Sequence, residues 1–203
     1  MSQYLRSALA ALALFALTPS GPAAAAEATP SEEIQSYYDV LYDVWRRADE
    51  LGFAGRFERL EPVIRRTFNM GFITQFSVGR YWAGLSGEQQ TTLIEAVTRL
   101  NAATYASRFD SFSGESLIVL DEKETKRGDI LVLTHIIDSE GEPVEINYLM
   151  RKQDETWQVV DVHLDGVISE LATRRSEYTS VLKREGFDGL LVAIDKIIAA
   201  LGE

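Results

Sequence analysis

A meander of four predicted strands, with helices before and after it, limits the fold of this chain more than any other feature. Side chains in these segments alternate across a pleat, which is the two-residue period of a β-strand. The predicted strands are Glu115–Asp121, Asp129–Asp138, Val144–Arg151 and Thr156–Leu164. Their connections are short and contain Gly128, Gly141 and the pair Asp154-Glu155. Since short connections join antiparallel neighbours, the sequence predicts a four-stranded antiparallel sheet.

Apolar residues at helical spacing occupy the chain on both sides of these strands. The predicted helices cover residues 34–48 with a stop at Gly52, then 56–68, 70–78, 86–109 and 168–185, with a last helix after Gly186. Ser86 and Gln89 have the spacing of a capping box, which marks a helix start. Helices, then a meander, then more helices is the order expected of an α+β domain.

Both faces of the predicted sheet carry apolar side chains. In the second strand the two alternating sets are Ile130, Val132 and Ile136 on one face, and Leu131, Leu133 and Ile137 on the other. A sheet with one solvated face would show polar residues on that face. The pattern therefore indicates that both faces are partly covered. Helices alone would suffice, and a bound apolar guest on one face is the alternative.

The N-terminus has the pattern of a secretory signal peptide. Arg6 precedes an apolar run from Ala8 to Leu17, and the small residues Ala23–Ala26 follow. Prolines and a glycine interrupt the run before it reaches the roughly 20 apolar residues that a membrane span needs. The sequence predicts cleavage after Ala26, with residues 1–26 as signal peptide and residues 27–203 as one domain in the periplasm. The chain has no cysteine, which excludes a lipoprotein anchor, a disulfide and a cysteine nucleophile.

The charge of the chain restricts its partners. The formal net charge is −11 at pH 7, and removal of the leader with Arg6 makes it more negative. An acidic chain is a poor match for nucleic-acid phosphates, so no nucleic-acid partner is expected. It is also repelled by anionic lipid, which disfavours tight residence on a membrane. A protein that visits a membrane and leaves again tolerates this repulsion, although the charge also serves simple solubility.

Acid–base chemistry has one candidate pair in this sequence. On an ideal strand Asp161 and His163 share a face at about 7 Å. A carboxylate and an imidazole in an apolar cone could transfer a proton in a small isomerase or hydratase. A hydrogen-bonded structural role is the simpler interpretation. Two histidines on different strands make a poor metal site, and there is no glycine-rich phosphate loop, so no cofactor is expected.

Aromatic residues offer a better lead to a binding site. They gather in two consecutive helical segments: Phe68, Phe72, Phe76, Tyr81, Trp82, Tyr105 and Phe109. At helical spacing such residues form a core or line a ligand site, and some must be core. Arg174 and Arg175 interrupt an apolar stripe further along the chain. They would lie at a cavity mouth or face solvent, and solvent is the simpler interpretation.

Several motifs in a fixed order resemble one family. They are Val78–Trp82, Ser86–Gln90, Thr104–Ala106, and the strand–turn–strand–helix–helix order from Glu142 to Leu191. This order is similar to that of the periplasmic lipid carriers of the MlaC family, also called Ttg2-type proteins. Two segments, Leu51–Phe57 and Ser169–Tyr178, look more like the hopanoid-associated HpnM branch. Near Arg174 the phospholipid-carrying members often have an aromatic residue, which this chain lacks.

The resemblance implies helices packed on a curved four-stranded sheet, similar to the nuclear-transport-factor-2-like cone, around an apolar cavity. It implies a non-enzymatic carrier that shuttles a hopanoid or a phospholipid between inner and outer membranes. The implied partners are an inner-membrane transporter, either the RND-type HpnN or an MCE-domain ABC system, and a transiently contacted membrane. An adaptor that docks on a transporter without holding lipid is a further alternative.

The residues expected to contact the lipid share apolar or aromatic character and positions on the predicted helices and strands around the cavity. They are Phe72, Phe76, Tyr81, Trp82, Leu100, Tyr105, Phe109, Leu133, Ile146, Tyr148, Met150, Val160, Val162, Leu171 and Tyr178.

Overall fold

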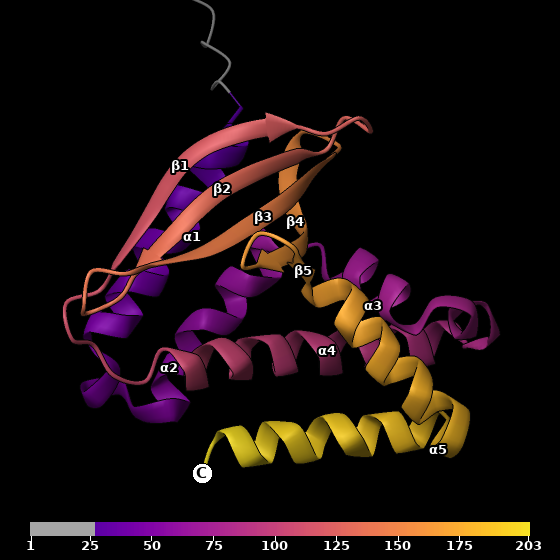
Figure 1. The fold of residues 1–203 in the computed structure, drawn as a ribbon. Coiled ribbons are helices and arrows are strands. Elements are labelled where there is room, and N and C mark those ends of the chain that lie inside the picture. Colours follow the sequence, from indigo (N-terminus) through magenta and orange to yellow (C-terminus); the bar gives the residue numbers. More distant parts are fainter. Residues whose placement is uncertain (1–26) are drawn as a thin grey trace, which may run out of the picture.

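The computed structural model describes residues 27–203, and the predicted signal peptide, residues 1–26, lies outside the described residues. The helices are α1 (Pro30–Arg46), α2 (Ala48–Thr67), α3 (Met70–Val78), the 3-10 helix η1 (Gly79–Gly84), α4 (Gly87–Arg108) and α5 (Glu170–Leu201). The strands are β1 (Ser116–Glu124), β2 (Ile130–Ile137), β3 (Pro143–Gln153), β4 (Thr156–Leu164) and β5 (Ile168–Ser169). Helices, a meander and a last helix follow in this order (Figure 1), as the sequence predicts.

The strands form one antiparallel sheet in the order β1-β2-β3-β4-β5. The prediction of four strands was wrong in number, because β5 is only two residues long and the sequence assigned Ile168 to the following helix. Ser169 pairs with His163 in this short strand. The strand then passes directly into α5, so β5 fixes where the last helix starts beside the sheet.

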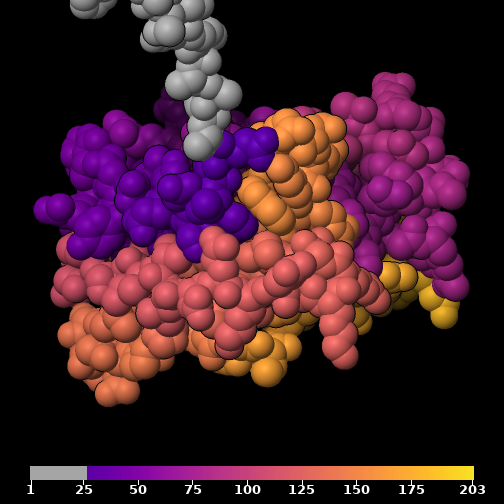
Figure 2. All heavy atoms as spheres, turned by 90° about the horizontal axis from the view of Figure 1, so that it is seen from above, coloured from indigo at the N-terminus to yellow at the C-terminus, as the bar shows by residue number. Residues whose placement is uncertain are grey.

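Register decides which strand residues face the helices. Tyr148 on β3 pairs with Val132 on β2 and with Val162 on β4, and all three are buried. Helix α1 packs along this face against β1 and β2 (Figure 1), and seen from above it lies directly beside β1 (Figure 2).

The opposite face of the sheet carries Leu131, Leu133 and Leu149, which are half-buried. Among residues 27–203, no helix runs along this side of β1 and β2 (Figure 1), while α3 reaches it at β3, where Phe72 contacts Arg151. The interpretation that helices cover both faces is therefore wrong for this part of the sheet, and the alternative of a bound guest stays a prediction.

Two glycines break the helices at the places that the sequence predicts. Gly52 inside α2 has φ 57° and ψ −179°, and Gly186 inside α5 has φ 71° and ψ −168°. Both helices continue in a new direction after the glycine, so the second part of α5 runs back beneath α4 (Figure 1). The predicted capping box of Ser86 and Gln89 opens α4.

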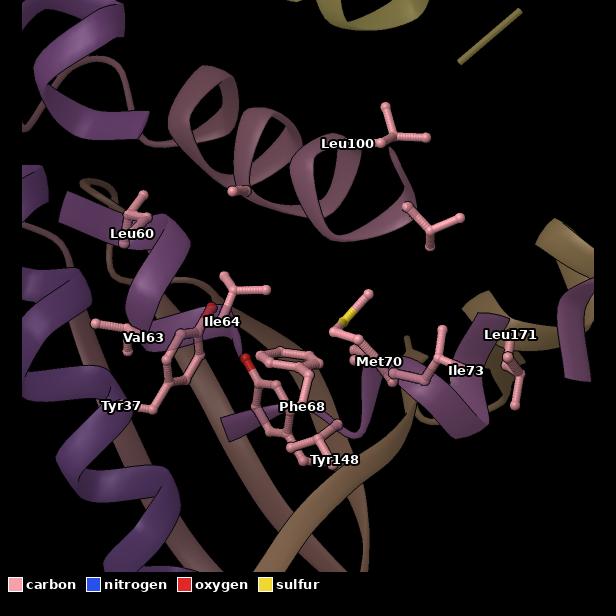
Figure 3. Packing of buried hydrophobic residues seen from close by; sticks show 14 of the residues in the cluster. Tyr37, Leu60, Val63, Ile64, Phe68, Met70, Ile73, Leu100, Tyr148 and Leu171 are labelled. Atoms are coloured by element: carbon pink, nitrogen blue, oxygen red, sulfur yellow. The ribbon is translucent and has the colours of Figure 1, made fainter. Parts of the chain in front are cut away.

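The core lies between the sheet and the helices and is centred on aromatic rings. Tyr37 on α1 packs edge-on against Phe68, Tyr105 and Tyr148, with ring centroids 5.6–6.2 Å apart. Met70 and Ile73 extend this core towards Leu171 at the start of α5 (Figure 3). No helix among residues 27–203 is long and apolar enough to cross a membrane.

Candidate functional site

An apolar cavity of about 210 Å³ lies between the sheet and the C-terminal end of α4. Most of its lining residues belong to the helix-facing side of the strands or to the aromatic core: Trp45, Tyr105, Arg108, Phe109, Ile136, Ile146, Tyr148, Val162, Leu164 and Glu170. Register explains the strand contribution, because Ile136, Ile146 and Tyr148 occupy alternate positions on the same face. The cavity can therefore receive a hydrocarbon group on a surface of rings and branched side chains.

The polar atoms at the inner end of this cavity are uncharged at neutral pH. Burial raises the pKa of Tyr105 to about 12 and that of Tyr148 well above its ordinary value. The hydroxyl of the neighbouring Tyr38 lies 2.6 Å from the hydroxyl of Thr134, and the Trp45 indole N–H donates to the Ser111 carbonyl at 2.6 Å. Groups that stay neutral let an apolar guest enter without displacing a buried charge.

Charge appears only where the cavity opens. A second pocket of about 250 Å³ shares Arg108, Leu164 and Glu170 with the cavity, so the two are adjacent. Its lining residues are Arg108, Leu164, Ile168, Glu170, Thr173, Arg174 and Glu177, and together they are called the mouth below. An apolar interior with a charged mouth is an arrangement that suits an amphiphile.

A third hollow, a groove of about 380 Å³, lies between α3, the β1–β2 turn and the start of α5. Phe72 and Phe76 stack in it, with the Arg151 guanidinium 4.6 Å from the Phe72 ring. Arg151 also donates twice to Asp129, at 2.7 and 2.8 Å, which lowers the pKa of that carboxyl. Leu149 and Asp161 line the groove from the sheet face opposite the cavity, so the two sites are separate.

The structure distributes the fifteen predicted contact residues over several places. Those that line the cavity are Tyr105, Phe109, Ile146, Tyr148 and Val162. Those that line the groove are Phe72, Phe76, Val160 and Leu171. Those in the packed interior away from both hollows are Leu100, Met150 and Tyr178, while Tyr81 and Trp82 lie half-buried in η1 and Leu133 lies on the opposite sheet face.

Five residues that line the cavity escaped the sequence-based selection: Trp45, Arg108, Ile136, Leu164 and Glu170. Ile136 and Leu164 carry a signal that points to them, because they share the strand face of Ile146 and Val162. Arg174 was expected in solvent, but its side chain is only 19% exposed. Its neighbour Arg175 is exposed and lies over the Phe76 ring.

Asp161 and His163, the candidate acid–base pair, lie at the junction of β4 with β5 and α5, where Asp161 binds the start of the last helix. Asp161 accepts hydrogen bonds from the backbone N–H of Val162 at 2.8 Å and of Leu171 at 3.0 Å. It also accepts from the Ser169 hydroxyl at 2.6 Å and lies 3.2 Å from His163 Nε2. Since Asp161 pairs with Leu149, it faces away from the cavity. This geometry favours the structural role over catalysis.

Replacing Asp161 by alanine should therefore destabilise the protein. The substitution removes the β4 carboxylate that accepts the Leu171 N–H in the first turn of α5. We expect a loss of about 2 kcal/mol in the free energy of unfolding. His163→Ala should cost less than about 1 kcal/mol, because it removes a single half-exposed partner. Urea unfolding followed by circular dichroism measures both. Equal midpoints for Asp161→Ala and the unaltered protein would refute this role.

Comparison with known proteins places this geometry in a family. A family model described as MlaC protein matches residues 35–196. The chain belongs to the MlaC family. The phospholipid-binding protein from Ralstonia solanacearum, solved in complex with a phospholipid, has a similar structure with a TM-score of 0.75. It is 21% identical and the match covers 87% of this chain and all of that one, so it shows that the two proteins share the MlaC fold. The resemblance and the α+β fold predicted from the sequence are confirmed, and the HpnM branch stays a prediction.

Proposed function

We propose that this protein is a non-enzymatic carrier that encloses the hydrocarbon part of a membrane lipid in the cavity and moves it between membranes. The observation that supports this best is the apolar cavity, bounded by Ile146, Tyr148 and Val162, whose charged lining residues lie only where it meets the mouth. The phospholipid bound to the Ralstonia solanacearum relative adds support. The finer assignments, periplasmic location and cleavage after Ala26, remain part of this proposal.

The physical need for such a carrier follows from the hydrophobic effect. Exposing some 400 Å² of lipid surface to water costs roughly 10 kcal/mol at about 25 cal/mol per Å². A dry cavity offsets this cost if the guest leaves water on entry. Binding must also be comparable with membrane residence, because a much tighter carrier would not unload.

The size of the cavity sets what it can hold. At about 210 Å³ it is smaller than the roughly 300–1,000 Å³ of common ligand sites. Together with the adjacent mouth of about 250 Å³ it enters that range. We infer that loading of a whole lipid widens the gap between the sheet and α4, while a single chain segment fits without movement.

The loop between β4 and β5 suits brief contact with a membrane or a transporter. Val167 at its tip is 83% exposed, and the next residue, Ile168, is 51% exposed and lines the mouth. Two apolar side chains held in water beside the opening reduce the distance that a lipid must travel through solvent. The partner itself, an RND-type HpnN or an MCE-domain ABC system, is proposed from the sequence resemblance alone.

Two rival functions lead to different experimental results. A small isomerase would need Asp161 and His163 in the cavity, and Asp161 faces the other side of the sheet. An adaptor without lipid would not need the cavity. Hopanoid and phospholipid both remain candidate guests, with the HpnM-like segments favouring the first and the solved relative favouring the second.

Lipid extraction from protein purified out of its native host tests the proposal. We expect mass spectrometry of the organic extract to show one class of membrane lipid at close to one molecule per protein. Protein denatured before purification and then refolded serves as the control, and should carry none. Native protein that carries no lipid above this control would contradict the carrier function and favour the adaptor.

A further inference from the structure

The mouth of the cavity contains two arginines and two glutamates around one hollow: Arg108, Arg174, Glu170 and Glu177. They come from the end of α4 and the first two turns of α5, which lie far apart in sequence. Because Arg108 and Glu170 also line the apolar cavity, the charges begin where the apolar surface ends. This boundary fixes the polarity of any molecule that spans both spaces.

Arg174 is largely buried and yet has only long polar contacts with the other residues between 27 and 203. Its nearest carboxylate oxygen, Glu170 Oε2, is 3.9 Å away, and its other contact, the Tyr178 hydroxyl, is 3.4 Å away. Good hydrogen bonds from N–H to O are about 2.7–3.2 Å long. A guanidinium has five N–H donors. Arg174 therefore retains donor capacity that the described residues do not use.

Two other arginines of this chain, buried Arg56 and the more exposed Arg151, contrast with Arg174. Arg56 donates to the carbonyls of Ala106 at 2.7 Å and Ala48 at 2.9 Å. Arg151 forms a two-pronged pair with Asp129 at 2.7 and 2.8 Å. The long contacts of Arg174 are thus not a general feature of this protein, and they occur where the side chain lines a hollow.

Arg108 and Arg174 share one carboxylate. Arg108 approaches Glu170 Oε1 at 3.4 Å, and Arg174 approaches the other oxygen at 3.9 Å. A single loosely held carboxylate between two guanidiniums leaves room for a second anionic group. Glu177 faces the same hollow and is exposed. Two positive and two negative groups leave the mouth without net charge, which does not favour a purely anionic headgroup.

We propose that the mouth is a headgroup site for a zwitterionic phospholipid. Arg108 and Arg174 hold the phosphate, and Glu177 faces the amine. Guanidinium groups match phosphate in charge and in the geometry of their paired donors. The acyl chain continues past Leu164 into the cavity. This inference rests on the proposed carrier function and specifies the class of lipid.

A competition experiment tests the headgroup site. Delipidated protein is incubated with vesicles that contain phosphatidylethanolamine, phosphatidylglycerol and diacylglycerol in equal amounts with matched acyl chains. The bound lipids are then separated from the vesicles and quantified by mass spectrometry. The ratio between lipids is the readout, because it does not depend on how much of a variant is folded.

Removing either arginine should lower the preference for phosphate. Arg174→Met keeps the aliphatic bulk, and we expect the ratio of bound phospholipid to diacylglycerol to fall about tenfold, which is the range of one charged hydrogen bond. Arg108→Met should act in the same direction, and its side chain is 55% exposed, so it carries the test if Arg174→Met does not fold. Arg184→Met on the same helix, 59% exposed and outside the mouth, is the control and should change nothing.

Glu177→Gln should reduce the ratio of bound phosphatidylethanolamine to phosphatidylglycerol several-fold. An unchanged ratio would overturn the assignment of the amine. Phospholipid-to-diacylglycerol ratios that stay unchanged in both arginine variants would overturn the phosphate site and leave the carrier function intact. Failure of the unaltered protein to bind any of the three lipids would overturn the phospholipid headgroup site, and the extraction of native protein described above would then decide whether the carrier function stands.

Discussion

Replacing Ile146 by tryptophan should reduce lipid loading by tenfold or more without unfolding the protein. Ile146 is half-buried and lines the cavity from the first half of β3. The indole ring of tryptophan at this position would fill space that a guest would use. Denying a guest about 100 Å² of apolar contact removes about 2.5 kcal/mol of binding, which exceeds a tenfold effect. Loading from labelled vesicles, measured after gel filtration, provides the readout.

The matched control is Leu133→Trp. Leu133 lies one strand away on β2 and faces the opposite side of the sheet, where it is also half-buried. The same enlargement there should leave loading unchanged, because that face does not line the cavity. If Leu133→Trp blocks loading and Ile146→Trp does not, the guest binds on the other face and the assignment of the cavity is wrong.

Alanine in place of Gly186 should cost about 3 kcal/mol in the free energy of unfolding. With φ 71° and ψ −168°, Gly186 has a backbone conformation that is essentially restricted to glycine. No atom outside its own chain neighbourhood lies within 4 Å of a Cβ built there, so the cost comes from the backbone alone. Straightening α5 to relieve it would lift buried Leu190 and Ile194 out of the core. Urea unfolding monitored by tryptophan fluorescence measures the change.

Gly87→Ala is the control for this backbone effect. Gly87 lies in the first turn of α4 with ordinary helical geometry and open space around it. Alanine there should be neutral or slightly stabilising, since it restricts the unfolded chain. Gly52→Ala, at the equivalent break in α2 with φ 57°, should behave like Gly186→Ala. If the Gly186 and Gly87 variants had the same free energy of unfolding, the helix break at residue 186 would not require glycine.

Much of the fold was predictable because its signals are local. Strand alternation located β1 to β4 within a few residues, and the Ser86–Gln89 capping box marked the start of α4. The glycines at the helix breaks were visible for the same reason, since a positive φ is a property of one residue. The two-residue β5 was missed because it is too short to show a period.

The site was less predictable because it depends on register and on distant contacts. Opposite Leu149 and Met150, β4 has a bulge with one extra residue. Alternation along the sequence therefore does not tell which face of the sheet each β4 side chain occupies. Arg108 and Glu170 are 62 residues apart in sequence, and nothing local indicates that they meet. The burial of Arg174 likewise depends on how the start of α5 lies against the rest of the molecule.

Photo-cross-linking with a phospholipid that carries a diazirine at the end of its acyl chain tests the central claim most directly. After loading and illumination, peptide mass spectrometry locates the labelled residues. We predict labels around the cavity, on the end of α4 and on the helix-facing side of β3 and β4, including Phe109, Ile146 and Val162. Labels confined to Phe72 and Phe76 in the groove, or to Leu133 on the opposite sheet face, would contradict the claim that the cavity shelters the lipid.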